Sequence, residues 1–266
     1  MKRSPTPLFV ADARLDAISG RLALCAHGAI PVPIMDAPSA ILIEPGASVS
    51  SRAVEVAAGL DVPLVWVGAG ATSYVNHAAP QRLARIQQQI RITSDPVLKR
   101  AAARRLFQVR YPHRRLHPRH SLGVIRGSEG AFMRELYRSM ARRHGVAWQG
   151  RNIHDPWDSL DPINRTLSAA HSCLYGISHA AIIATGFVPS LGILHRDSTA
   201  RGLVFDIADT VKADTTIPLA FQIVSTGCDA PEWVVRHQCA KLFRSGHLFS
   251  RLMQITISAF ETTVTT

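Results

Sequence analysis

The chain has 266 residues, of which 47% are hydrophobic, which is enough for a substantial core and excludes wholesale disorder. Lysine and arginine total 30 against 19 acidic residues, a formal net charge of +11, so nucleic acid is the first partner to consider. Composition alone does not separate a nucleic-acid-binding protein from a generally basic soluble one.

The cysteines and the N-terminus bear on the cellular compartment. The four cysteines form no CxxC pair, so we expect free thiols in a reducing cytoplasm rather than zinc ligands or disulfides. The N-terminal residues become charged before the apolar region of a signal peptide could form, so none is expected. The longest apolar run, residues 177–194, is interrupted by Gly, Pro and His and predicts buried core, with no membrane partner.

Residues 1–77 are predicted to form a small β-rich domain. Ser50 or Ser51 is expected to cap a short helix over residues 52–60. Residues 63–75 predict two strands joined by a Gly turn, because their GAG string lacks the lysine of a phosphate-binding P-loop. Further short apolar runs, separated by Gly, Pro and Asp as strands are, lie at Arg21–Cys25, Ala40–Ile43 and Val62–Val67.

The pattern then becomes helical, with residues 78–84 as the predicted linker and 85–266 as a larger α-helical domain. The fold class is therefore α+β. Asp95 before Pro96 is typical of an N-cap followed by proline in the first turn of a helix. Further helices are predicted at 164–185, 218–224 and 232–252, and the tail at 257–266 is expected to fray.

Two segments between these helices are open to more than one interpretation. Residues 111–120, YPHRRLHPRH, predict a basic loop that is either a solvated connector or a flexible phosphate contact. In the string IRGSEGAFMRELY, Ser128 is expected near the start of a long helix and Glu129 in or near its first turn. A glutamate in a first turn is favoured by the helix dipole and needs no further function.

The main chemical signal lies in residues 192–215, GILHRDSTARGLVFDIADTVKADT. Asp206 and Asp209 are three residues apart and share one face of a predicted helix, beside apolar neighbours. Two carboxylates next to a buried face require a cation, ion pairs or water. His195 could supply a nitrogen ligand and Lys212 could hold a phosphate. We interpret this segment as one half of a divalent-metal site for phosphodiester chemistry.

Several longer strings extend this interpretation to nearly the whole chain. They are LDAISGRLAL, LIEPGASVSSRAV, PLVWVGAGA, IRGSEGAFMRELY, INRTLSAAHSCLYGISHAAIIATGFVPSLGILH and FDIADTVKADTTIPLAF. In this order and at this spacing they resemble the CRISPR-associated spacer-integration endonuclease, the universal integrase of CRISPR adaptation, and its type I-E branch in particular. RGSEG alone would be a weak match, and the ordered set is the specific one.

The resemblance implies which residues form the site. Glu129 of RGSEG, His195 of GILH and Asp209 of DIAD match the family's metal ligands. Glu and Asp are hard oxygen ligands suited to Mg²⁺ or Mn²⁺, and one His shifts the preference towards Mn²⁺. The full catalytic set carried over by motif is Glu129, His195, Asp209, Asp206, Lys212 and Tyr175. The DNA contacts carried over are Arg82, Arg126, Arg236 and Lys241.

The activity implied is joining of spacer DNA to a repeat by transesterification, in which a 3′-hydroxyl attacks a phosphodiester with the help of a divalent cation. With water as the nucleophile the same site is a nuclease. The implied partners are double-stranded and branched DNA, a second copy of the chain in a homodimer formed through the β domains, and a small ferredoxin-like CRISPR adaptation partner. The biological role implied is spacer acquisition in antiviral defence.

The chain departs from the family in its N-terminal part. Members of the type I-E branch use an aromatic residue to brace a frayed DNA end, and the nearest match in this chain is His27. The hairpin that follows is short, because only PVPIMDAPS separates one strand from the next. End-bracing and part of the N-terminal sheet are therefore open.

Three alternatives remain. One is a non-catalytic, DNA-binding architectural protein of the same fold, in which the acid pair is a cap or an ion-pair network. Another is a metal-dependent phosphohydrolase for small esters, which the charge of +11 and the lack of a nucleotide loop disfavour. The last is a helical scaffold for other proteins. Metal-dependent cleavage of branched DNA distinguishes the enzyme from the first.

Overall fold

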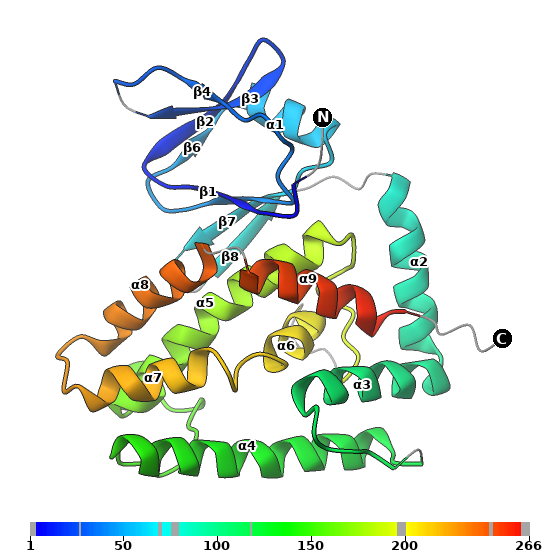
Figure 1. Ribbon diagram of the computed structural model, residues 1–266, viewed down its shortest axis with the longest axis vertical. Helices are drawn as coiled ribbons and strands as arrows, with labels where there is room; N and C mark the ends of the chain where they lie inside the picture. The colour runs from blue at the N-terminus through cyan, green and yellow to red at the C-terminus, as the bar shows by residue number, and fades with distance from the viewer. Residues whose placement is uncertain are drawn as a thin grey trace.

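The computed structural model describes residues 4–26, 28–68, 71–75, 80–117, 119–195, 201–244 and 247–261. Two small sheets lie at one end of the molecule, and the helices form the remainder (Figure 1). The predicted α+β class, with an N-terminal sheet region before a larger helical region, is confirmed.

The elements follow one another in a simple order. The strands are β1 (Leu8–Val10), β2 (Ala13–Ile18), β3 (Arg21–Ala26), β4 (Val32–Pro33), β5 (Ile41–Ile43), β6 (Ser48–Val49), β7 (Leu64–Gly68) and β8 (Ala71–Val75). The helices are α1 (Ser51–Gly59), α2 (Pro80–Ser94), α3 (Pro96–Arg110), α4 (Leu122–His144), the 3₁₀ turn η1 (Trp157–Ser159), α5 (Pro162–Ala184), α6 (Gly202–Asp209), α7 (Thr216–Ser225), α8 (Pro231–Arg244) and α9 (His247–Ala259).

The strands form two four-stranded sheets, in the orders β1-β5-β7-β8 and β4-β3-β2-β6. β2 and β3 pair antiparallel with Ile18 opposite Arg21, so the turn between them is Ser19 and Gly20. Both turn residues have positive φ, 50° and 75°, which matches the twist of a tight hairpin. β7 and β8 also pair antiparallel, as predicted for residues 63–75.

Strand β5 connects the sheet region to the helices, because successive side chains of a strand point to opposite faces. Ile41 and Ile43 pack into a core with Leu15 of β2, whereas Leu42 packs into the main helical core with Leu174 of α5. One sheet therefore has a hydrophobic core on each face, and the helical region rests on a fixed support.

Helix α5 is the central element of the helical region. Figure 1 shows it running diagonally between the sheets and α7, and most of its residues are buried. Among the described helices it is long and apolar enough to cross a membrane by length and composition, but 67% of that stretch is buried inside the protein. The prediction that this segment forms core is supported by this burial.

Local capping signals fixed several helix starts. Ser50 accepts a hydrogen bond from the Ala53 amide at the start of α1. Asp95 accepts from the amides of Val97 and Leu98 at the start of α3, and Pro96 occupies the first turn. These side chains satisfy backbone donors that a helix leaves unpaired at its N-terminus.

Other boundaries differ from the predictions. The predicted single helix over 232–252 is two helices, α8 and α9, and the sequence between them contains a Ser-Gly pair that is typical of helix ends. Residues 80–84 of the predicted linker already belong to α2. The tail expected to fray from 257 onwards is helical to Ala259, and Phe260 is fully buried against Phe187. Residue 27, named for end-bracing, lies outside the described residues.

Candidate active site

Glu129 projects from the middle of α4, and the predicted position in a first turn is wrong. The helix starts at Leu122, where Ser121 caps the amide of Val124. Glu129 is therefore about two turns inside the helix. The glycines of IRGSEG suggested a helix start, but they lie within the helix. Because the helix dipole acts on end residues, it does not account for a half-buried glutamate at this position.

His195 lies in the loop after α5, and Asp206 of α6 holds that loop in place. The fully buried carboxylate of Asp206 accepts hydrogen bonds from the backbone amides of Ile193, Leu194 and His195. Its Oδ1 atom also lies 2.7 Å from Nδ1 of His195. Because this contact places the proton on Nδ1, Nε2 keeps its lone pair for another ligand. Asp206 is thus a positioning residue.

Gly192 allows the same loop to approach α6 closely. A Cβ atom at this position would lie 2.8 Å from the backbone carbon of Gly202 and would also meet the carbonyl oxygen of His195. A side chain here would displace either the loop or the start of α6. The glycine of the GILH string therefore helps to set the position of the histidine.

Asp209 is the last residue of α6 and pairs with Lys212, one turn further on. Nζ of Lys212 also donates to the hydroxyl of Tyr175, at 2.7 Å. The lysine side chain is only 10% exposed, and Asp209 compensates its charge while Tyr175 accepts one of its hydrogen bonds. The three residues form one connected chain of contacts from α5 to the site.

Arg110, the last residue of α3, lies between the two acidic groups. Its guanidinium is 3.6 Å from Glu129 Oε1 and 3.7 Å from Asp209 Oδ2. The arginine side chain is only 5% exposed. The sequence analysis missed this residue because α3 contains several arginines. Arg110 lies four residues after buried Leu106 and three after Phe107, so helical spacing places it on the apolar face of α3. An arginine on an apolar face is the signal that could have identified it.

The three predicted metal ligands converge although they come from α4, a loop and α6. Glu129, His195 and Asp209 line one cavity of about 500 Å³, together with Arg110 and Arg126. A much smaller cavity of about 10 Å³, close to the volume that one water needs, is lined by the same ligands and by Asp206. Among the described residues, however, no group of three His, Cys, Asp or Glu side chains is close enough to hold a metal ion.

The residues nevertheless suit a small, hard divalent cation. Two carboxylates and an imidazole with a free Nε2 are the ligand types that Mg²⁺ and Mn²⁺ use, and they face a shared space. In the present arrangement the carboxylate oxygens contact Arg110 and Lys212 instead. A bound cation would have to replace part of this positive charge.

The site environment shifts the pKa of Glu129, His195, Asp209 and Lys212. Burial raises the pKa of Glu129, and Arg110 only partly opposes that effect. Burial would also raise the pKa of Asp209, but the charges of Lys212 and Arg110 outweigh it and lower the value. The hydrogen bond to Asp206 raises the pKa of His195. Burial lowers the pKa of Lys212, but its two partners raise it more.

The predicted DNA contacts divide into three groups. Arg126 is exposed on α4 and lines the site cavity. Arg236 and Lys241 lie on α8 and line a different cavity, between the helices and the sheet region. Arg82 is buried, pairs with Asp61 at 2.9 Å and donates to the carbonyl of Ile183. In the structure Arg82 joins the sheet region to α5, and its predicted DNA contact stays a prediction.

Comparison with known proteins identifies similar chains. A family profile described as CRISPR associated protein Cas1 matches residues 108–228, the segment that contains the site. The CRISPR-associated endonuclease Cas1 of Escherichia coli strain K12 is 34% identical over 264 residues, covering 96% of this chain and 84% of the relative. A relative from Methanospirillum hungatei, CRISPR-associated endonuclease Cas1 3, is 36% identical over 258 residues, covering 95% and 85%. A solved structure described as "Crystal structure of TtCas1-DNA complex" has a TM-score of 0.81 at 30% identity and covers 96% of each chain.

Proposed function

The chain belongs to the Cas1 family of CRISPR-associated endonucleases, and on this premise we propose that it is a divalent-metal-dependent DNA endonuclease and integrase of CRISPR adaptation. The observation that supports this proposal most is the convergence of Glu129, His195 and Asp209 on one cavity from three separate elements. Double-stranded and branched DNA are the proposed substrates. In the proposed reaction a 3′-hydroxyl of spacer DNA attacks a phosphodiester of the repeat, forms a new phosphodiester and releases the 3′-hydroxyl of the neighbouring repeat nucleotide.

Each residue of the site has a role that its contacts suggest. A divalent cation held by Glu129, Nε2 of His195 and Asp209 would neutralise charge on the phosphate oxygens and lower the pKa of the attacking hydroxyl. Asp206 keeps the imidazole in the tautomer that leaves Nε2 free. Lys212, a cation fixed by Asp209 and Tyr175, adds positive potential beside the reacting phosphate. With water in place of the 3′-hydroxyl, the same arrangement hydrolyses DNA.

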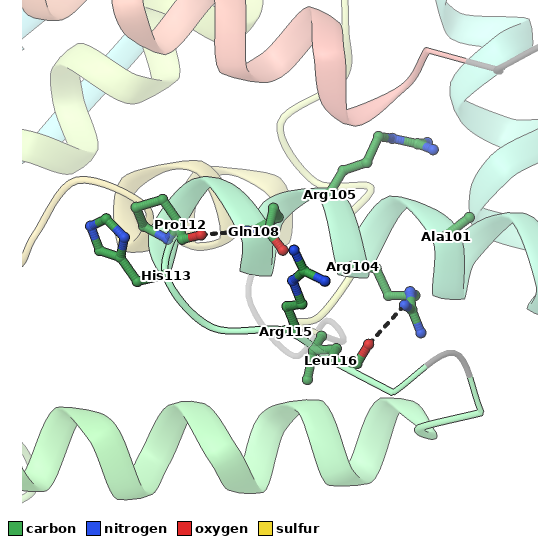
Figure 2. A pocket seen from close by; sticks show the side chains of 8 residues that line it. All are labelled: Ala101, Arg104, Arg105, Gln108, Pro112, His113, Arg115 and Leu116. Carbon is green, nitrogen blue, oxygen red and sulfur yellow. Dashed lines mark hydrogen bonds between the residues drawn. The ribbon is translucent and has the colours of Figure 1, made fainter.

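A basic hollow, lined by none of the residues of the two site cavities, suits the DNA backbone. It has a volume of about 800 Å³ and lies between α3 and the loop that follows it. Figure 2 shows Arg104 and Arg115 reaching towards the same space, while Arg105 extends to α9 and donates to the carbonyl of Ala259. Arg104 is fixed by the carbonyls of Leu116 and His117. Pre-positioned guanidinium groups bind phosphate without reading sequence.

The salt dependence of DNA binding tests this surface. We expect the logarithm of the association constant to fall linearly with the logarithm of salt concentration. Arg115→Ala should weaken binding to all sequences alike and reduce the slope by about one, because one phosphate contact is lost. Fluorescence anisotropy of labelled DNA measures both quantities. Arg14→Ala, an exposed arginine on β2, is the control. An unchanged slope in Arg115→Ala would remove the loop from the proposed interface.

Metal removal separates the proposed enzyme from an architectural DNA-binding protein of the same fold. EDTA is expected to abolish cleavage of branched DNA, and Mn²⁺ or Mg²⁺ added in excess is expected to restore it. DNA binding should persist in EDTA, because none of the three proposed metal ligands lines the basic hollow. Gel assays and anisotropy give the two readouts. Cleavage that continues in EDTA, or addition of metal that restores none, would favour a different chemistry.

The proposed assembly is a homodimer formed through the β domains, working with a small ferredoxin-like adaptation partner in the cytoplasm. Support for the dimer comes from three apolar residues around β4, where Ile30 is 88%, Val32 62% and Met35 69% exposed. Clustered apolar side chains of this size at a sheet edge are typical of interaction surfaces. Arg236 and Lys241, away from the site cavity, are proposed as further backbone contacts for DNA.

A further inference from the structure

Arg110 is held in the site more loosely than a buried arginine usually is. Its distances of 3.6 and 3.7 Å to Glu129 and Asp209 exceed those of charge-assisted hydrogen bonds, which are about 2.7–2.9 Å. Its Nε atom is buried and has no hydrogen-bond partner among the residues that the structure describes. The guanidinium carbon also lies 5.4 Å from the ring centre of Tyr111. The guanidinium thus supplies charge to the site without strong directed bonds.

The charges of Glu129 and Asp209 are balanced only because Arg110 is there. The carboxylate of Asp206 is stabilised separately, by hydrogen bonds from the loop amides and from His195. Glu129 and Asp209 carry two further negative charges, and Arg110 and Lys212 carry two positive ones. Lys212 is anchored by Asp209 and Tyr175, so Arg110 is the cation that can move with least loss of bonding. A divalent cation would compete with it for the same two carboxylates.

We propose that Arg110 is a displaceable counter-ion, which keeps Glu129 and Asp209 together until a divalent cation binds and then turns towards the DNA phosphate. This inference rests on the metal site of the proposed function. Arg110 also lines the cavity of about 500 Å³, so the displaced guanidinium remains beside the reacting strand. The positive charge of the cation, Arg110 and Lys212 then exceeds that of the two carboxylates, and a phosphodiester reduces this excess. Cation and DNA should therefore bind cooperatively.

The test is the affinity for Mn²⁺ in the absence of DNA. Arg110→Gln removes the competing charge, so we expect it to bind Mn²⁺ at least about tenfold more tightly than the unsubstituted protein. It should also melt at a lower temperature without metal and be stabilised more by Mn²⁺. Calorimetry and thermal melts give these values. Arg142→Gln, in an exposed ion pair with Glu135 on α4, is the matched control and should change neither.

The outcomes separate this inference from the proposed function. In one outcome the unsubstituted protein binds Mn²⁺ and Glu129→Gln does not, so the metal site stands. If Arg110→Gln then binds Mn²⁺ only as tightly as the unsubstituted protein, or more weakly, the counter-ion role is overturned. If neither the unsubstituted protein nor Arg110→Gln binds Mn²⁺, both fail.

A second measurement uses the unsubstituted protein and does not depend on the folding of a variant. With ¹⁵N-labelled arginine, the Nε resonance of Arg110, assigned by its loss in Arg110→Lys, should shift as Mg²⁺ is added. A resonance that stays in place when the cation site is saturated would overturn the proposed displacement.

Discussion

Asparagine in place of Asp209 is expected to lower DNA cleavage and strand transfer by about 100-fold or more. The substitution keeps the size of the side chain but removes the charge that would hold the cation. Loss of a residue that only hydrogen-bonds to a metal ligand lowers activity by about 10–100-fold, and loss of a ligand itself should lower it at least as much. Mn²⁺ affinity should fall together with activity. DNA binding should change little, because the basic hollow is lined by other residues.

The control for this variant is Asp214→Asn, which makes the same chemical change at an exposed ion pair with Arg251. It should keep full activity. Purified variants are compared in a strand-transfer assay with excess Mg²⁺ or Mn²⁺, after far-UV circular dichroism has shown that they are folded. Strand transfer by Asp209→Asn above about a tenth of the unsubstituted rate would remove this carboxylate from the proposed chemistry.

Alanine in place of Asp206 should have the largest effect on stability, because one carboxylate satisfies three backbone amides and an imidazole. Each buried donor left without an acceptor costs about 1–3 kcal/mol, so the free energy of unfolding should fall by about 3 kcal/mol or more. Urea unfolding measures the change. Activity should fall as well, since the loop that holds His195 loses its anchor.

Asp206→Asn is the graded control, because its amide oxygen can still accept while its amide nitrogen cannot. Its loss of stability should lie between those of the unsubstituted protein and the alanine variant. Equal unfolding free energies, within about 1 kcal/mol, for Asp206→Ala and the unsubstituted protein would show that the loop amides find other acceptors.

Local signals in the sequence predicted much of the fold. The cap at Ser50, the Asp95–Pro96 helix start and the paired strands at 63–75 are each determined by neighbouring residues. Asp206 and Asp209 could likewise be placed on one helix from their spacing. Such features do not depend on distant parts of the chain, and they are the ones that the sequence predicted correctly.

Features that depend on distant contacts were the ones missed. Glu129 was placed at a helix start because the glycines beside it resemble a helix boundary. Arg82 was assigned to DNA by the family resemblance, and its burial against Asp61 and Ile183 was missed because it depends on how the sheet region meets α5. Arg110 could not be separated from other arginines of α3 without its partners on α4 and α6. That Glu129 shares one site with His195 and Asp209 was implied only by the family resemblance.

Diffraction from a crystal soaked with Mn²⁺ tests the proposed metal site most directly. The expected result is one anomalous peak within coordination distance of the Glu129 carboxylate, Nε2 of His195 and the Asp209 carboxylate. The contradictory result is a saturated crystal with no such peak, in which both carboxylates still face Arg110 and Lys212. The molecule would then be a basic DNA-binding protein without the proposed catalytic centre.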